Sequence, residues 1–142
     1  MAGGVQDRGH RAIPGLQRGV TDEAVDVSTL RELRRLQAPG QPDVAVRILT
    51  RFFHESDERL ATLRAATARG DAPAIERAAH ALKGIAGTVG AHEVCNLAQR
   101  LEQGGREGRT QDAAGLVNQL DSALERARAI FERALEIPGP AA

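Results

Sequence analysis

Apolar residues recur every three or four positions through most of the chain, which is the period of an amphipathic helix. The pattern is clearest in one segment, where five apolar residues follow at steps of four, three, four and three: Ile75, Ala79, Leu82, Ala86 and Val89. No stretch alternates apolar and polar residues with the period of two that a half-buried strand shows. The pattern therefore predicts an all-α protein.

Helix start and stop signals divide the apolar pattern into one short helix and four longer ones. We predict a short helix from a capping box at Thr29 and Glu32 to Pro39, and longer helices from Asp43 to Gly70, from Asp71 to Gly90, through Val94 and Leu101 up to Gly104-Gly105, and through Leu116 and Ala134 before Pro138. A chain of 142 residues is long enough for one core built from such helices. The predicted fold is an up-down four-helix bundle with an additional short N-terminal helix.

The two ends of the chain show no helical period. Residues 1–20 contain five glycines and one proline, a composition that is typical of flexible segments. We therefore expect a flexible leader over residues 1–22, one folded domain over residues 23–137, and a disordered tail over residues 138–142.

The third predicted helix contains Gly84 and Gly87, although a glycine inside a helix costs about 1 kcal/mol relative to alanine. The apolar residues of this helix fall within about 40° of one line around the helix axis. Measured from the first of them, His80, Gly84 and Gly87 lie at about 140°, 180° and 120°. His80 is therefore predicted to point away from the core, beside two residues without side chains. Lys83 lies one turn along the helix, where its ammonium group can reach the surroundings of the ring.

This combination of residues suits phosphoryl chemistry on a nitrogen nucleophile. An exposed histidine is mostly neutral at pH 7, so one ring nitrogen has a lone pair that can attack phosphorus. Lys83 could partly neutralise the bound phosphoryl group, and the glycines would let the acidic pocket of a partner approach. Protonation of the other ring nitrogen would make the ring a good leaving group. The residues indicate a phosphoryl carrier rather than a hydrolase.

The segment around this histidine resembles a known signature. His80-Ala81-Leu82-Lys83-Gly84, followed by Val89-Gly90-Ala91, is similar to the motif of histidine-containing phosphotransfer (HPt) domains of phosphorelays. The resemblance covers most of residues 26–134, including Phe52-Phe53, Gly70-Asp71 and Leu101-Glu102. It implies a helical bundle whose histidine accepts a phosphoryl group from the aspartate of one receiver domain and passes it to another. It also implies that His80 is the phosphoacceptor, Lys83 its electrostatic partner and Gly84 the gap for receiver docking.

The surroundings of His80 are expected to bind the partner. We assign six residues to this partner-binding surface: Glu76, Arg77, Gly84, Gly87, Glu102 and Arg106. Several family members have glutamine at the position of Glu102. Two arrangements are open for this glutamate, a surface ion pair with Arg106 four residues along the helix or a contact with His80. The second arrangement would favour the charged ring over the neutral nucleophile.

Composition narrows the classes of function and location. The chain has 19 basic and 19 acidic residues, so it lacks the basic excess that usually accompanies nucleic-acid binding. Its one cysteine excludes an intramolecular disulfide and suits a reducing compartment. No apolar run approaches membrane-spanning length. We therefore expect a cytoplasmic protein, monomeric by default, without a nucleic-acid or membrane partner.

The sequence contains no pattern that is typical of a resident metal or nucleotide. It has no cysteine pair or His-Glu-x-x-His for zinc and no glycine-rich nucleotide-binding region, so self-phosphorylation by ATP is not expected. We expect a phosphocarrier rather than an enzyme, without a cofactor of its own, that uses the Mg²⁺ of its partner. The expected partners are response-regulator receiver domains and a hybrid sensor histidine kinase. The alternative is a helical adaptor that binds a receiver or kinase without phosphotransfer.

Overall fold

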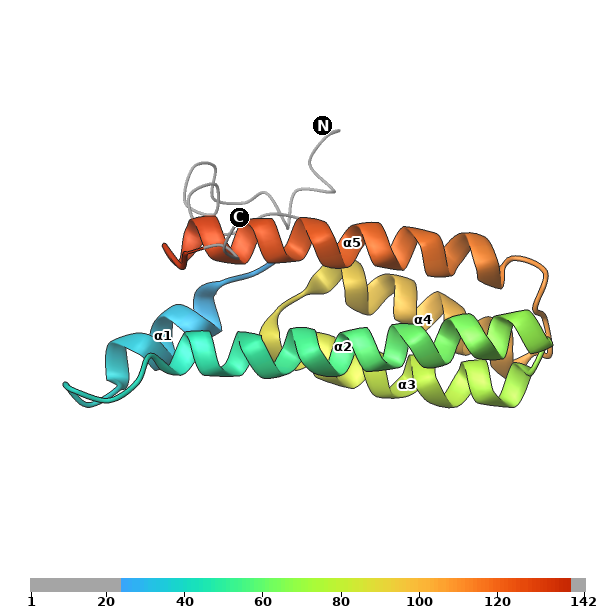
Figure 1. The fold of residues 1–142 in the computed structure, drawn as a ribbon, viewed down its shortest axis with the longest axis horizontal. Coiled ribbons are helices and arrows are strands. Elements are labelled where there is room, and N and C mark those ends of the chain that lie inside the picture. The colour runs from blue at the N-terminus through green and yellow to red at the C-terminus, as the bar shows by residue number, and fades with distance from the viewer. Residues whose placement is uncertain (1–23, 139–142) are drawn as a thin grey trace, which may run out of the picture.

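The computed structural model describes residues 24–138 and consists of five helices (Figure 1). They are α1 (Ser28–Leu36), α2 (Val44–Arg69), α3 (Ala72–Val89), α4 (His92–Arg106) and α5 (Ala113–Ala134). No β-strand occurs within the described range, in agreement with the predicted all-α class. The predicted leader and residues 139–142 of the predicted tail lie outside the described residues.

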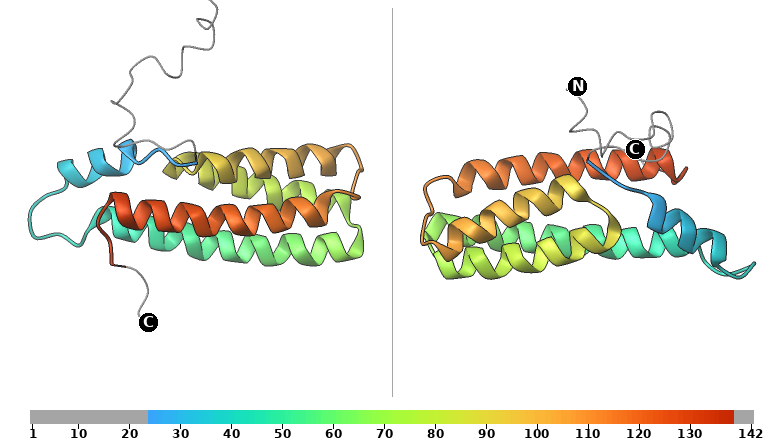
Figure 2. Two further views of the ribbon diagram at one scale, coloured as in Figure 1. Left: turned by 90° about the horizontal axis from the view of Figure 1, so that it is seen from above. Right: turned by 180° about the vertical axis from the view of Figure 1, so that it is seen from behind.

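Helices α2 to α5 form an up-down bundle in which successive helices run in opposite directions (Figures 1 and 2). Helix α3 packs against α2 and α4, and α5 packs against α4 and α2. Helix α1 lies at one end of the bundle, where α2 begins and α5 ends (Figure 1). The predicted four-helix bundle with an extra N-terminal helix is confirmed.

The apolar stripe of each long helix faces a common core. The largest side chains that are almost fully buried come from all four long helices and include Leu63, Ile75, Leu82, Leu101, Leu120 and Phe131. All five apolar residues of the pattern that predicted α3 are buried. This burial fixes the rotation of α3 about its axis, and therefore which of its residues face solvent.

Local signals set the ends of α2 and α3 as predicted. The Asp43 carboxylate accepts hydrogen bonds from the first turn of α2, and that of Asp71 accepts one from the amide of Ala74 in α3. Gly70 ends α2 with φ of 66°, and Gly90 ends α3 with φ of 87°. Both glycines adopt the left-handed conformation that other residues reach only at a cost.

The predicted capping box at Thr29 is wrong, because α1 begins at Ser28 and Thr29 therefore lies inside its first turn. The Asp26 carboxylate accepts hydrogen bonds from the amide of Ser28 at 2.9 Å and from its hydroxyl at 2.7 Å. Asp26 is itself held by a 2.8 Å hydrogen bond from its amide to the carbonyl of Gly90. The α3–α4 turn therefore positions Asp26, which binds the first residue of α1. Local sequence alone could not indicate this.

The predicted end of the fourth helix at Gly104-Gly105 is also wrong, because α4 continues to Arg106. A Cβ atom added to Gly105 would lie 2.8 Å from both the carbonyl oxygen of Ala72 and the amide nitrogen of Glu76. Gly105 thus permits a close approach of α4 to the first turn of α3. The helix can continue through this residue because the glycine serves packing rather than termination.

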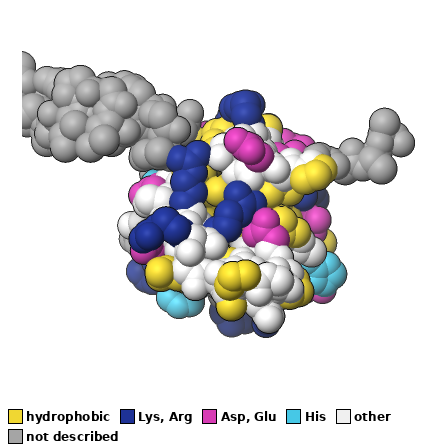
Figure 3. Space-filling model, turned by 90° about the vertical axis from the view of Figure 1, so that its left-hand side faces the viewer, with side chains coloured by type: hydrophobic (Ala, Val, Ile, Leu, Met, Phe, Trp, Pro, Cys, Tyr) yellow, Lys and Arg dark blue, Asp and Glu magenta, His cyan; other side chains and the backbone are white. Residues whose placement is uncertain are grey.

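Helix α1 closes one end of the bundle through two arginines. The Arg31 guanidinium donates to the carbonyl of Ala134 at 2.8 Å, and that of Arg34 donates to the carbonyl of Leu135 at 2.7 Å. Arg34 also pairs with Asp43 at 2.9 Å. These arginines satisfy carbonyl groups that the end of α5 leaves without helical partners. Figure 3 shows this end of the molecule, where basic and apolar side chains lie next to each other.

Candidate functional site

His80 projects from the outer face of α3. Its neighbours Ala79 and Leu82 are fully buried in the core, whereas the His80 side chain is 69% exposed. The predicted orientation of this histidine is therefore confirmed. A ring held on a rigid helix and exposed to this degree can meet a partner protein without a change in the fold.

One edge of the His80 ring contacts a buried carboxylate from the neighbouring helix. The Nδ1 atom of His80 lies 2.7 Å from Oε2 of Glu102 in α4, and the Glu102 side chain is only 5% exposed. An ionised carboxylate can only accept hydrogen bonds, so Nδ1 must carry the proton and donate it. In the neutral ring the lone pair then belongs to Nε2.

Glu102 also binds two cations. The Lys83 ammonium lies 2.6 Å from Oε1 of Glu102, and the Arg106 guanidinium lies 3.0 Å from Oε2. Arg106 further pairs with Glu76 of α3 at 3.2 Å. Both arrangements that the sequence left open for Glu102 therefore occur together. The result is a charge network that joins α3 to α4 on the side of the phosphoacceptor candidate.

The hydrogen bond from Lys83 is the main cause that lowers the pKa of the Glu102 carboxyl, and the hydrogen bond from His80 acts in the same direction. Burial opposes this shift but does not reverse it. Glu102 is consequently ionised at neutral pH. This supports its assignment as the acceptor for the Nδ1 proton.

The two glycines beside His80 leave open space. A Cβ atom added to Gly84 would meet nothing within 4 Å, and one added to Gly87 would meet only the Sγ atom of Cys95 at 3.9 Å. Neither glycine lies in the left-handed region. Packing and backbone conformation therefore do not explain Gly84, which leaves a bare surface one turn from His80.

The remaining predicted partner-binding residues surround this centre. Glu76 and Arg106 form the ion pair described above, and Arg77 is exposed on α3. Sequence reasoning missed Gly105, which brings α4 close enough to α3 for Glu102 to reach His80. The signal that could have found it is its position three residues after Glu102, where it lies on nearly the same face of α4.

Residues 24–138 contain neither a metal site nor a membrane-spanning helix. No group of His, Cys, Asp and Glu side chains there is arranged to hold a metal ion. None of the helices in that range has the length and apolar character needed to cross a membrane.

Comparison with known proteins agrees with this geometry. Residues 47–130 match the family model of the Hpt domain. The chain is also similar to the crystal structure of histidine-containing phosphotransfer protein B (HptB) from Pseudomonas aeruginosa PAO1, with 28% sequence identity and a TM-score of 0.70. That match covers 82% of this chain and 97% of the other. No curated protein matches the chain.

Proteins of this kind are phosphocarriers rather than conventional enzymes, and they work with two-component partners such as receiver domains and kinases. The family match includes α3 with its exposed histidine and α4 with the buried glutamate. The chain belongs to the Hpt domain family and is a histidine phosphotransfer protein of phosphorelay signalling.

Proposed function

We propose that Nε2 of His80 accepts a phosphoryl group from the aspartate of one receiver domain and passes it to the aspartate of another. The observation that carries this proposal is the 2.7 Å contact between Nδ1 and the buried Glu102 carboxylate. It holds the ring in one orientation and leaves the lone pair on the exposed nitrogen. Glu102 acts as a positioning residue in this reaction.

In the accepting step, the Nε2 lone pair attacks the phosphorus of a receiver's aspartyl phosphate. The N–P bond forms as the bond between phosphorus and the aspartyl oxygen breaks, and the aspartate leaves with the electron pair as a carboxylate. The Nδ1 proton stays on the ring, whose positive charge is countered by Glu102. In the donating step, a receiver carboxylate attacks phosphorus, and the electron pair of the N–P bond returns to Nε2.

The surrounding residues support this exchange. Lys83 is 32% exposed, so its ammonium can move from Glu102 toward a phosphoryl group on the neighbouring ring. Gly84 leaves room for the receiver, and Glu76, Arg77, Gly87 and Arg106 supply the rim of the docking surface. The receiver supplies the Mg²⁺, and a sensor kinase acts upstream, because His80 takes the group from another protein rather than from ATP. We place this exchange in the cytoplasm and assign it to a monomer.

The direct test of this function is incubation of the protein with a panel of phosphorylated receiver domains and Mg²⁺, followed by intact-mass measurement. We expect the mass of one phosphoryl group on the protein, lost in acid and stable in base, as phosphohistidine requires. No adduct with any receiver, including those encoded beside it, would favour the adaptor alternative.

Substitution at Gly84 separates docking from chemistry. We expect Gly84→Gln to fold with equal or greater stability, because its side chain enters open space and glutamine favours helix over glycine. Transfer from a phosphorylated receiver should fall roughly tenfold or more, equivalent to about 1.4 kcal/mol, because the added side chain blocks approach. The measurement is the rate of phosphoryl transfer, monitored by rapid quenching of the reaction and electrophoresis of the phosphoproteins.

Two controls accompany this variant. Labelling by phosphoramidate, a small donor that needs no docking, should remain close to wild type. Ala65→Gln, which places the same side chain on an exposed position of α2, should leave receiver transfer unchanged. An equal loss in both glutamine variants, or an unaltered rate in Gly84→Gln, would show that Gly84 is not part of the docking surface.

Glu102 should also make stability depend on pH. Its pKa in the folded protein lies below the ordinary value of 4.5, so it contributes stability above that value and loses it as pH falls through the folded pKa. We expect the free energy of unfolding of wild type to decline more between pH 7 and pH 3 than that of Glu102→Gln. Urea titrations at several pH values measure the difference, and parallel declines for the two proteins would contradict the assigned network.

A further inference from the structure

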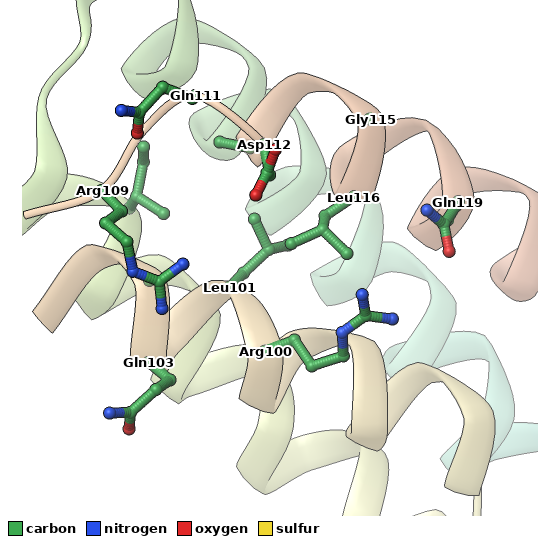
Figure 4. A pocket seen from close by; sticks show the side chains of 12 residues that line it. Arg100, Leu101, Gln103, Arg109, Gln111, Asp112, Gly115, Leu116 and Gln119 are labelled. Carbon is green, nitrogen blue, oxygen red and sulfur yellow. The ribbon is translucent and has the colours of Figure 1, made fainter. Parts of the chain in front are cut away.

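A concave site lies on the side of α4 away from His80, between α4 and the start of α5 (Figure 4). It encloses about 550 Å³, a volume within the range of about 300–1,000 Å³ that is usual for small-molecule sites. We call it the α4–α5 cleft, and it shares none of its lining residues with the phosphoacceptor site. Its floor is apolar and includes Ile75 and Leu101, which are buried, and Leu116, which is half-buried.

Polar side chains line the rim of the cleft on both walls. The cleft is lined by two arginines, Arg100 and Arg109, and by the amides of Gln103, Gln111 and Gln119. Figure 4 shows the Arg109 guanidinium and the Asp112 carboxylate turned toward the space over Leu101, with Arg100 reaching up from α4. An apolar surface with a few convergent polar groups is the usual composition of a ligand site.

The charges of the cleft are only partly used within the protein. Arg109 pairs with Glu107, whereas the Arg100 side chain has no ion-pair or hydrogen-bond partner within residues 24–138. Asp112 directly precedes α5, yet its side chain does not cap that helix. Because Glu107 already neutralises Arg109, one guanidinium and one carboxylate that are unpaired within the described range face the cleft, and Arg100 is the group available to bind an anion.

A glycine in the wall keeps the cleft open. Gly115 lies in the first turn of α5 with ordinary helical φ, and a Cβ atom added there would meet nothing within 4 Å. Neither backbone conformation nor packing therefore requires glycine at this position. The same two observations apply to Gly84 beside His80. The protein therefore has a bare helical surface in the α4–α5 cleft and another beside the phosphoacceptor candidate.

We propose that the α4–α5 cleft binds a small organic anion, with a carboxylate or phosphate paired to Arg100 and an apolar body resting on the half-buried Leu116. Gln119 on the α5 wall, whose side chain has no partner within residues 24–138, can then orient the ligand by a hydrogen bond. Because Glu102 faces α3 from the opposite side of α4, the ligand and a receiver at His80 can be bound together. This site is independent of the proposed phosphotransfer chemistry.

The test is a titration of the ¹⁵N-labelled full chain with benzoate and, separately, with phenyl phosphate. Binding is monitored by ¹H–¹⁵N NMR. Benzamide is the matched neutral probe. We expect both anions to shift amide signals of residues 100–119, and benzamide to shift them weakly or not at all. Arg100→Gln should weaken binding roughly tenfold or more. Gly115→Leu, which fills the cleft, should abolish binding.

Two controls keep the result interpretable. Arg59→Gln removes an exposed arginine of α2 and should bind like wild type, and circular dichroism should give equal helix content for all variants. Equal shifts with benzamide, equal affinity in Arg100→Gln, or no shift at roughly 10 mM of either anion would overturn the proposal. A response to phenyl phosphate alone would narrow the ligand to phosphates.

Discussion

Replacement of His80 by glutamine is expected to abolish phosphoryl acceptance from every receiver domain while leaving the fold intact. Glutamine retains a polar group near Glu102 but offers no ring nitrogen with a lone pair that can attack phosphorus. The side chain is 69% exposed, and Glu102 keeps Lys83 and Arg106 as partners. The free energy of unfolding should therefore change by no more than about 0.5 kcal/mol.

The measurement combines intact mass after receiver incubation with thermal melting of the same sample. His54→Gln is the matched control, because His54 is also exposed on a helix, at 73%, and pairs with a glutamate, Glu58. It should accept the phosphoryl group like wild type. A phosphoryl adduct on His80→Gln would show that another residue is the acceptor, whereas a large fall in melting temperature would mean that this histidine has a structural role.

Gly105→Ala is expected to destabilise the protein by about 2–3 kcal/mol, although alanine normally strengthens a helix. The added Cβ atom would lie 2.8 Å from two backbone atoms of α3, and backbone cannot rotate away as a flexible side chain can. The helices must separate to relieve the overlap. Glu102 lies three residues before Gly105 on α4, so we expect the separation to disturb its contact with His80 and to slow phosphoryl transfer as well.

The neighbouring glycine supplies the control for this variant. An added Cβ atom at Gly104 would lie 3.5 Å from the nearest atom, the carbonyl oxygen of Arg109, which is an ordinary contact. Gly104→Ala should therefore keep wild-type stability or gain up to about 1 kcal/mol. Urea denaturation compares the pair. If Gly105→Ala is as stable as Gly104→Ala, the close approach of α3 and α4 at Gly105 does not contribute to the stability of the fold as described.

The parts of the fold that sequence could predict are those that depend on one segment. The apolar spacing from Ile75 to Val89 determined which face of α3 is buried, and this was enough to place His80 outward. Asp43, Gly70, Asp71 and Gly90 act on their own helix ends, so their effects are local and were predicted. The resemblance around His80 added the chemistry.

The parts that sequence could not predict depend on contacts between distant segments. Gly105 could be interpreted as a helix stop, because only the backbone of α3 shows that it is a contact residue. The environment of Glu102 was open for the same reason, since its partners lie on two helices. Asp26 holds the start of α1 through Ser28 and is itself held by a hydrogen bond with Gly90, more than 60 residues away.

The most direct test of the central claim is NMR of the protein after labelling with phosphoramidate, with correlation of phosphorus to the ring protons of His80. Two ring carbons that carry hydrogen are bonded to Nε2, whereas only one such carbon is bonded to Nδ1. We expect one phosphohistidine whose phosphorus couples to both ring protons, which identifies Nε2 as the site. Coupling to one ring proton only, or a phosphoryl group on any other residue, would contradict the assignment of Nε2 of His80 as the phosphoryl carrier.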